Sequence, residues 1–212
     1  QVWDLEGFFL NGSTLTMVGG YNFAEGEGQF KSGDIFISTT GEPVFGGSYY
    51  KNDNTPPTIN DNLEIKNQFG YNYVIDLDFP NESFHLYRID SAATLLASHY
   101  YGYGIDGVSN QASDPVSYIS GGTYLNTGDL IYQTGLDDVS GAYTGGFHNA
   151  VSVALDFLDV GTSFYSHFTM ECGNDNLMGH GTTAPVPEPA TMLLLGTGLI
   201  GMAGLGRKRL KR

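Results

Sequence analysis

Hydrophobic and polar residues alternate with a period of two along much of the chain, which is the pattern of half-buried strands. The clearest example covers residues 71–79, where Tyr73, Ile75 and Leu77 are separated by more polar positions. This alternation predicts a strand with those three side chains on the inner face of a sheet. A second clear alternation begins at Val151 and predicts another strand.

Turn-forming residues separate the predicted strands. Asn11-Gly12 lies between two hydrophobic runs and predicts a tight hairpin, because both residues tolerate positive φ. Pro56-Pro57 lies within a polar stretch at 51–62 that cannot be an interior strand and is therefore predicted as a loop. Residues 91–98 fit either a short helix or a strand.

These elements predict an all-β domain over residues 1–172. At least eight strands and no long soluble helix favour an antiparallel β-sandwich, of which the jelly roll is one form. The last strand is expected at 162–170, and the Gly- and Thr-containing stretch 173–186 is expected to be a linker.

The chain ends in an uncharged apolar run at 190–206 followed by a basic tail. Seventeen helical residues would extend about 25 Å, which is marginal for a bilayer core of about 30 Å. We expect one transmembrane helix there. Because basic residues that flank an apolar run stay on the cytoplasmic side, the tail should be cytoplasmic; it comprises Arg207, Lys208, Arg209, Lys211 and Arg212.

The order of Pro187-Glu188-Pro189, apolar run and basic tail resembles the PEP-CTERM sorting signal of Gram-negative bacteria. This resemblance implies an exported protein whose partner is exosortase, a membrane protease-transpeptidase that processes the tail. It implies insertion in the inner membrane first, then delivery to the periplasm, the cell surface or the medium. An ordinary C-terminal anchor helix is the alternative reading of the same residues.

Charge narrows the range of partners. Before Pro187 the chain holds 4 basic and 22 acidic residues, a net charge of 4 − 22 = −18. Such a body repels nucleic acid and anionic lipid, so neither is expected as a partner of the domain. Such a charge could attract cations or neutral hydroxyl-rich molecules, but an excess of acidic residues is also a common means of keeping a protein soluble, and that explanation is favoured.

Acid-rich turns provide the only candidates for a metal site. Asp76, Asp78, Asn81 and Glu82 offer the hard oxygen ligands that calcium takes. Solvated turns explain the same residues, and none fits the calcium-binding loop of an EF-hand. We therefore expect no cofactor, with calcium as the alternative.

Cys172 is the single cysteine, so it cannot form an intramolecular disulfide. It lies in His167–Gly179, which is similar to a segment, about "HFTMECGNDNLMG", that precedes the sorting tail in one subset of these proteins. Its position between a predicted strand and a Gly-Asn-Asp turn predicts a thiol that reacts with a thiol reagent in the folded protein, and a buried, inert thiol is the alternative.

Three functions follow, in this order. The first is a non-catalytic protein of the cell envelope or extracellular matrix; the family context of the tail implies a link to exopolysaccharide and biofilm. The second is a lectin-like carbohydrate-binding module that uses exposed aromatic residues, with or without calcium. The third is a glycoside hydrolase, which would need two carboxylates about 5–10 Å apart in one pocket.

Overall fold

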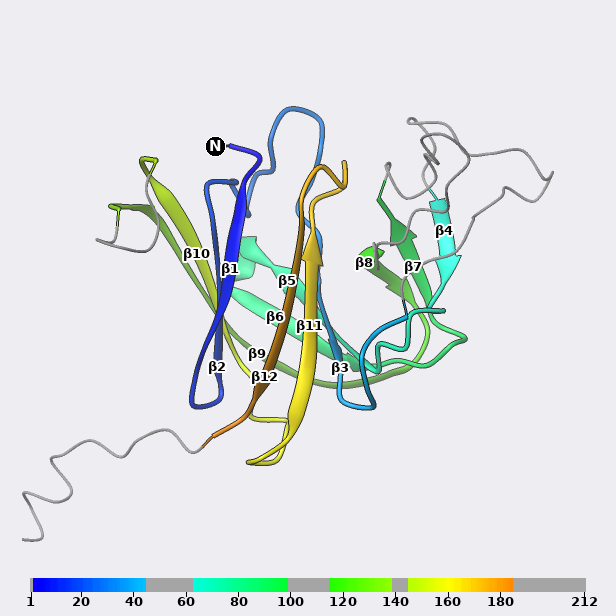
Figure 1. The fold of residues 1–212 in the computed structure, drawn as a ribbon. Coiled ribbons are helices and arrows are strands. Elements are labelled where there is room, and N and C mark those ends of the chain that lie inside the picture. Colours follow the sequence, from blue (N-terminus) through cyan, green and yellow to red (C-terminus); the bar gives the residue numbers. More distant parts are fainter. Residues whose placement is uncertain (1, 45–62, 99–114, 139–144, 185–212) are drawn as a thin grey trace, which may run out of the picture.

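The computed structural model describes residues 2–44, 63–98, 115–138 and 145–184 (Figure 1). The predicted loop at 51–62 and the whole sorting tail, including 190–206, lie outside these residues. Within the described part, no helix is long and apolar enough to cross a membrane. The described chain is all-β apart from the single 3-10 turn η1 (Phe79–Asn81), which confirms the predicted class.

Nine strands form one continuous antiparallel sheet in the order β1-β2-β10-β9-β6-β5-β3-β11-β12. Their bounds are β1 Leu5–Asn11, β2 Thr14–Gly19, β3 Ile35–Ser38, β5 Tyr73–Asp78, β6 Ser83–Arg88, β9 Thr123–Leu136, β10 His148–Ala154, β11 Ser163–Thr169 and β12 Asn176–Thr182. A smaller antiparallel sheet in the order β4-β7-β8 comprises β4 Leu63–Lys66, β7 Thr94–Ala97 and β8 Pro115–Ser120. It lies to one side of the large sheet in Figure 1.

The large sheet curls until its two edge strands, β1 and β12, lie side by side, which gives a nearly closed barrel (Figure 1). Eight successive antiparallel pairings make the first and ninth strands run in the same direction. A hydrogen bond joins the two chain segments near each end of the β1–β12 contact, which we call the seam. The Leu5 N–H donates to Oδ2 of Asp175 at 2.9 Å, and the Ala184 N–H donates to the Gly12 carbonyl at 3.2 Å. The predicted sandwich is therefore wrong for the main core, because a single sheet wraps around that core and the small sheet packs only on the outer face of the barrel.

Two hydrophobic clusters are buried. The larger fills the barrel and includes Leu15, Phe23, Ile75 and Phe168. Tyr73 and Leu77 pack against it, so the predicted inner face of residues 73–77 is confirmed.

The second cluster lies between the outer face of the barrel and the small sheet, and it includes Phe36, Tyr71 and Val74. Val74 is fully buried, although the alternation alone assigned its side of β5 to water. The small sheet covers that part of the outer face, so β5 is buried on both sides around Val74.

Two sequence predictions need correction, and one open alternative is resolved. The linker predicted at 173–186 is wrong over Asn176–Thr182, which forms β12 and pairs with β11 along its whole length. The first hairpin turns at Gly12-Ser13, one residue later than Asn11-Gly12, because Asn11 pairs with Thr14. Gly12 has φ 64, the value that a turn with glycine in its first central position needs. Finally, residues 94–97 form strand β7, which resolves the ambiguity at 91–98.

Candidate functional site

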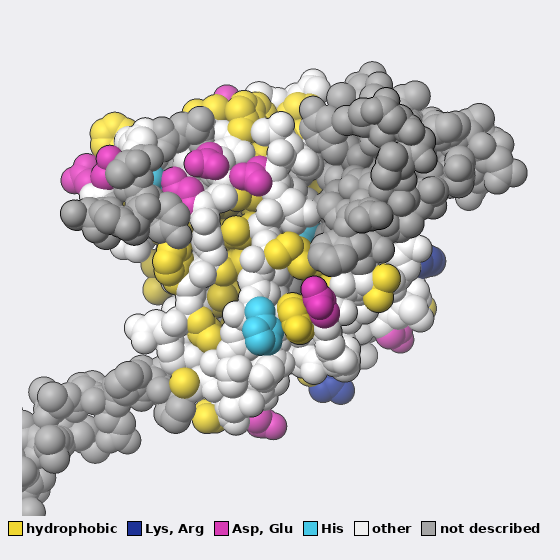
Figure 2. Space-filling model, in the orientation of Figure 1, with side chains coloured by type: hydrophobic (Ala, Val, Ile, Leu, Met, Phe, Trp, Pro, Cys, Tyr) yellow, Lys and Arg dark blue, Asp and Glu magenta, His cyan; other side chains and the backbone are white. Residues whose placement is uncertain are grey.

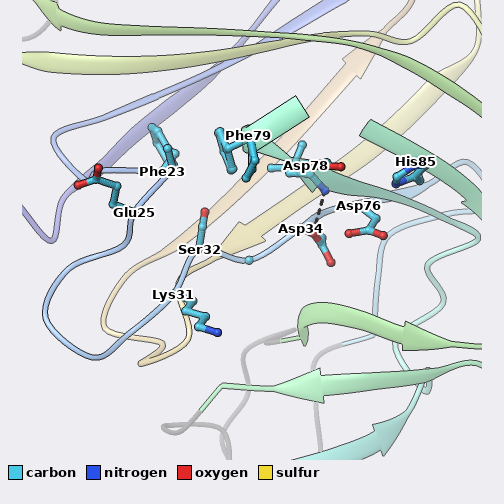
Figure 3. A pocket seen from close by; sticks show the side chains of 13 residues that line it. Phe23, Glu25, Lys31, Ser32, Asp34, Asp76, Asp78, Phe79 and His85 are labelled. Carbon is cyan, nitrogen blue, oxygen red and sulfur yellow. Dashed lines mark hydrogen bonds between the residues drawn. The ribbon is translucent and has the colours of Figure 1, made fainter. Parts of the chain in front are cut away.

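A cleft of about 520 Å³ opens on the outer face of the barrel. It lies between the segment 23–34 and the residues around the end of β5, and a site of this size is in the range of small-molecule pockets. The polar side chains around it are those of Glu25, Lys31, Ser32, Asp34, Asp76, Asp78 and His85 (Figure 3).

Three of these residues form a row across neighbouring strands. Ile35 pairs with Ile75, so Asp34, just before β3, lies opposite Asp76 on β5. Asp76 in turn pairs with His85 on β6. Figure 3 shows the two carboxylates beside each other, with His85 beyond Asp76.

Asp34 holds the barrel and the small sheet together. Its Oδ1 accepts from the Leu77 N–H at 3.1 Å and its Oδ2 accepts from the Tyr118 N–H at 2.7 Å. The side chain is 5% exposed. Burial, and then the facing Asp76 carboxylate, raise the pKa of Asp34, while the two backbone donors oppose that rise.

Asp76 has a different environment. The residue is half-buried, and its carboxylate has no hydrogen-bond partner among the described residues, although its backbone lies in the β5–β6 ladder. Burial raises the pKa of Asp76, and the neighbouring His85 opposes the rise. The Ser32 hydroxyl is also buried without a partner in the described chain. The cleft therefore contains polar groups whose hydrogen-bonding capacity the described fold does not use.

Aromatic side chains continue the site from the cleft along the outer face. Tyr118 stacks on Tyr87 with ring centroids 4.4 Å apart and an interplanar angle of 25°. Tyr124 meets Tyr87 edge-on at 5.6 Å and also lies 6.4 Å from His85, which lines the cleft. Tyr124 is 52% exposed. We call Tyr87, Tyr118 and Tyr124 the tyrosine row.

The four calcium candidates do not form a metal site. Asp78 accepts from the Asn81 backbone N–H at 3.3 Å and from its side-chain amide at 2.8 Å, so the pair caps the turn η1. Glu82 ends that turn with φ 49. Among the described residues, no group of three or more His, Cys, Asp and Glu side chains could hold a metal ion. Of the four, only Asp76 belongs to the row across β3, β5 and β6 that also contains Asp34 and His85.

The structure also places Cys172 and its surrounding segment. Cys172 is 4% exposed and belongs to the barrel core, and burial raises its pKa. The thiol is therefore buried in the core and not exposed at the surface, which is the alternative that the sequence left for Cys172. Residues 167–179 form the β11–β12 hairpin that closes the barrel.

Several of the site residues carried no signal in the sequence. Asp34 is the exception, because a carboxylate directly before the apolar run Ile35-Phe36-Ile37 is a signal that the sequence shows. His85, Tyr87, Tyr118 and Tyr124 looked like ordinary strand residues, and their proximity depends on the pairing of β6 with β9 and on the docking of the small sheet.

The fold and the cleft define an all-β, barrel-like protein with an acidic and aromatic outer face. Residues 185–209 match the family model described as the PEP-CTERM protein-sorting motif. The chain thus carries the sorting signal that the resemblance implied, and this signal marks an exported protein that exosortase handles. No curated protein and no solved structure matches the chain. The motif residues Pro187, Glu188 and Pro189 lie outside the described residues.

Proposed function

We propose that the protein is a non-catalytic component of the cell envelope or extracellular matrix that contacts exopolysaccharide through the outer face of its barrel. The sorting motif supports export and exosortase as a partner. The single observation that carries the binding role is the tyrosine row beside the cleft.

A tyrosine row suits a saccharide ligand for a physical reason. Tyrosine offers a large apolar ring face, which the C–H bonds of a sugar ring can cover, and a hydroxyl for hydrogen bonding. Tyr87 is held by its contacts with Tyr118 and Tyr124, so the platform loses little side-chain freedom on binding. Tyr124 is the most exposed of the three, and we assign it the principal contact.

The positions of the carboxylates favour binding over hydrolysis. A glycoside hydrolase needs one carboxyl group as acid and a second as base or nucleophile, both reaching the substrate. Both oxygens of Asp34 already accept backbone N–H groups at 3.1 and 2.7 Å. Asp34 is therefore committed to the fold and is a poor catalytic partner for Asp76, and Asp78 is likewise engaged with Asn81 at the turn η1.

Affinity electrophoresis tests the binding role. The full-length protein, kept in detergent, is run through gels containing exopolysaccharide from the host bacterium. Retardation is expected, and Tyr124→Ala should reduce it. Phe147→Ala is the matched control, because Phe147 is an exposed aromatic outside the row. Equal retardation of the two variants, or none for the unmodified protein, would contradict the proposal.

For the tail, we propose that residues 190–206 insert in the inner membrane with the basic cluster in the cytoplasm. Moving five cations through hydrocarbon costs several kcal/mol even on the most lenient scales. The barrel is fixed up to Ala184, so only Pro185 and Val186 separate it from Pro187. We expect cleavage near Pro187-Glu188-Pro189; an intact C-terminus at Arg212, found by mass spectrometry in cells with active exosortase, would contradict it.

A further inference from the structure

The cleft holds two facing carboxylates, and no Lys or Arg side chain of the described residues pairs with either of them. Asp34 and Asp76 lie opposite each other in the β3–β5 register, an arrangement that destabilises a sheet when both are charged. In the described part of the chain, neither carboxylate forms an ion pair with Lys or Arg. His85, which pairs with Asp76 across β5 and β6, is the nearest basic group in the row.

The surroundings of the pair increase the excess of negative charge. Glu25 and Asp78 also line the cleft, and Lys31 is the one Lys or Arg residue in its described lining. The chain before the sorting motif carries a net charge of −18. On the face shown in Figure 2, acidic side chains are spread widely and basic ones are few. A positively charged ligand would gain more in this cleft than a neutral or negative one.

Hydroxyl-binding groups converge on the same space. The Ser32 hydroxyl is buried without a partner in the described chain, although it lines the cleft, and an unused buried hydroxyl costs free energy until it is satisfied. Figure 3 shows Ser32 on the opposite side of Asp34 from Asp76. His85 connects the cleft to Tyr124 of the tyrosine row.

We infer that the cleft binds an amino sugar, with its protonated amine at Asp76, its hydroxyl groups at Ser32 and His85, and the next sugar ring on Tyr124. The inference rests on the proposed function, since it names the class of saccharide. An ammonium group supplies the charge that the carboxylate pair lacks, and its hydrogen bonds to a carboxylate are stronger than neutral ones. The tyrosine row would hold the sugar ring that follows the amino sugar in the saccharide chain.

Calorimetric titration of the full-length protein in detergent tests this inference. The two probes are the pentamers of glucosamine and of N-acetylglucosamine, which differ in the charge of the nitrogen. We expect the glucosamine pentamer to bind at least about tenfold more tightly, as expected for a charge-assisted hydrogen bond. Asp76→Asn should remove most of that preference, whereas Asp159→Asn should keep it. Asp159 is an exposed carboxylate outside the cleft.

The possible results separate the two proposals. If both pentamers bind equally and Tyr124→Ala weakens both, the amino-sugar inference fails while the saccharide-binding function stands. If Asp76→Asn and Asp159→Asn retain the same preference, the cleft is not the amine site. If neither pentamer nor the exopolysaccharide binds, the proposed function fails as well. The urea midpoint of Asp76→Asn serves as the folding control, and it should be no lower than that of the unmodified protein, because the variant removes a like charge from Asp34.

Discussion

The backbone N–H of Leu5 donates to Oδ2 of Asp175 at 2.9 Å, and this bond joins residues 170 positions apart at the seam of the barrel. Asp175 is held in turn, since the Thr169 hydroxyl donates to its carbonyl at 2.5 Å. The first strand and the last hairpin therefore depend on each other, and the barrel closes only when both are present.

Close packing at the seam predicts a cost for any side chain at Gly179. A Cβ there would lie 2.5 Å from Ser166 Oγ and 3.0 Å from Phe8 Cδ2. Gly179→Ala should lower the free energy of unfolding by about 1–3 kcal/mol, the usual cost of overpacking. Urea unfolding measures it.

A second substitution controls that experiment. The Ser166 hydroxyl is buried without a partner among the described residues, so Ser166→Ala alone should be close to neutral. Combined with Gly179→Ala, it removes the nearer clash and should restore part of the loss. Strict additivity of the two changes would refute the contact as the cause.

The thiol of Cys172 should be unreactive in the folded protein. It is 4% exposed, and burial raises its pKa, so little thiolate is available. A colorimetric thiol reagent should label the native protein slowly and the denatured protein at once. Rapid labelling without denaturant would show that the hairpin opens readily.

The pKa values of two histidines should be shifted in opposite directions. The hydrogen bond that His148 donates to the Asp138 carboxylate, together with the one to Glu6, raises the pKa of His148; its Nε2 lies 3.0 Å from Asp138 Oδ1 and its Nδ1 lies 2.7 Å from Glu6 Oε1. Burial lowers the pKa of His167 to about 4, and its Nε2 donates to the Pro115 carbonyl at 3.0 Å.

The two shifts have opposite consequences for stability. A raised pKa means that the contribution of His148 is complete below about pH 6.5 and is lost as the pH rises through its folded-state pKa. A lowered pKa means that the contribution of His167 is present above about pH 6.5 and is lost as the pH falls towards 4. NMR titration of the ring protons, assigned with His148→Gln and His167→Gln, measures both; coincident curves would contradict the prediction.

The acidic pair predicts a further pH dependence. Because the pKa of Asp34 is raised in the fold, the folded state binds more protons than the unfolded state above about pH 4. The free energy of unfolding should therefore fall as the pH rises from about 4 through the raised pKa. Asp76→Asn removes the like charge and should flatten this fall, whereas Asp159→Asn should leave it unchanged. Urea unfolding at a series of pH values measures the slopes, and equal slopes in the two variants would contradict the assignment.

The sequence by itself determined the local features. Alternation placed Tyr73, Ile75 and Leu77 on the core face, because side chains on a strand point to opposite sides in turn. The order of Pro187-Glu188-Pro189, apolar run and basic tail was enough to recognise the sorting motif, since the signal is contiguous.

Tertiary structure alone decided how the strands assemble. The interior of a barrel and that of a sandwich leave the same period-two pattern, so only the meeting of β1 and β12 distinguishes them. The same holds for the candidate site. Asp34, Asp76 and Tyr118 are far apart in sequence, and strand register and the docked small sheet bring them together. Val74 shows the physical reason: its burial depends on a sheet from elsewhere in the chain, and no local pattern encodes such long-range contacts.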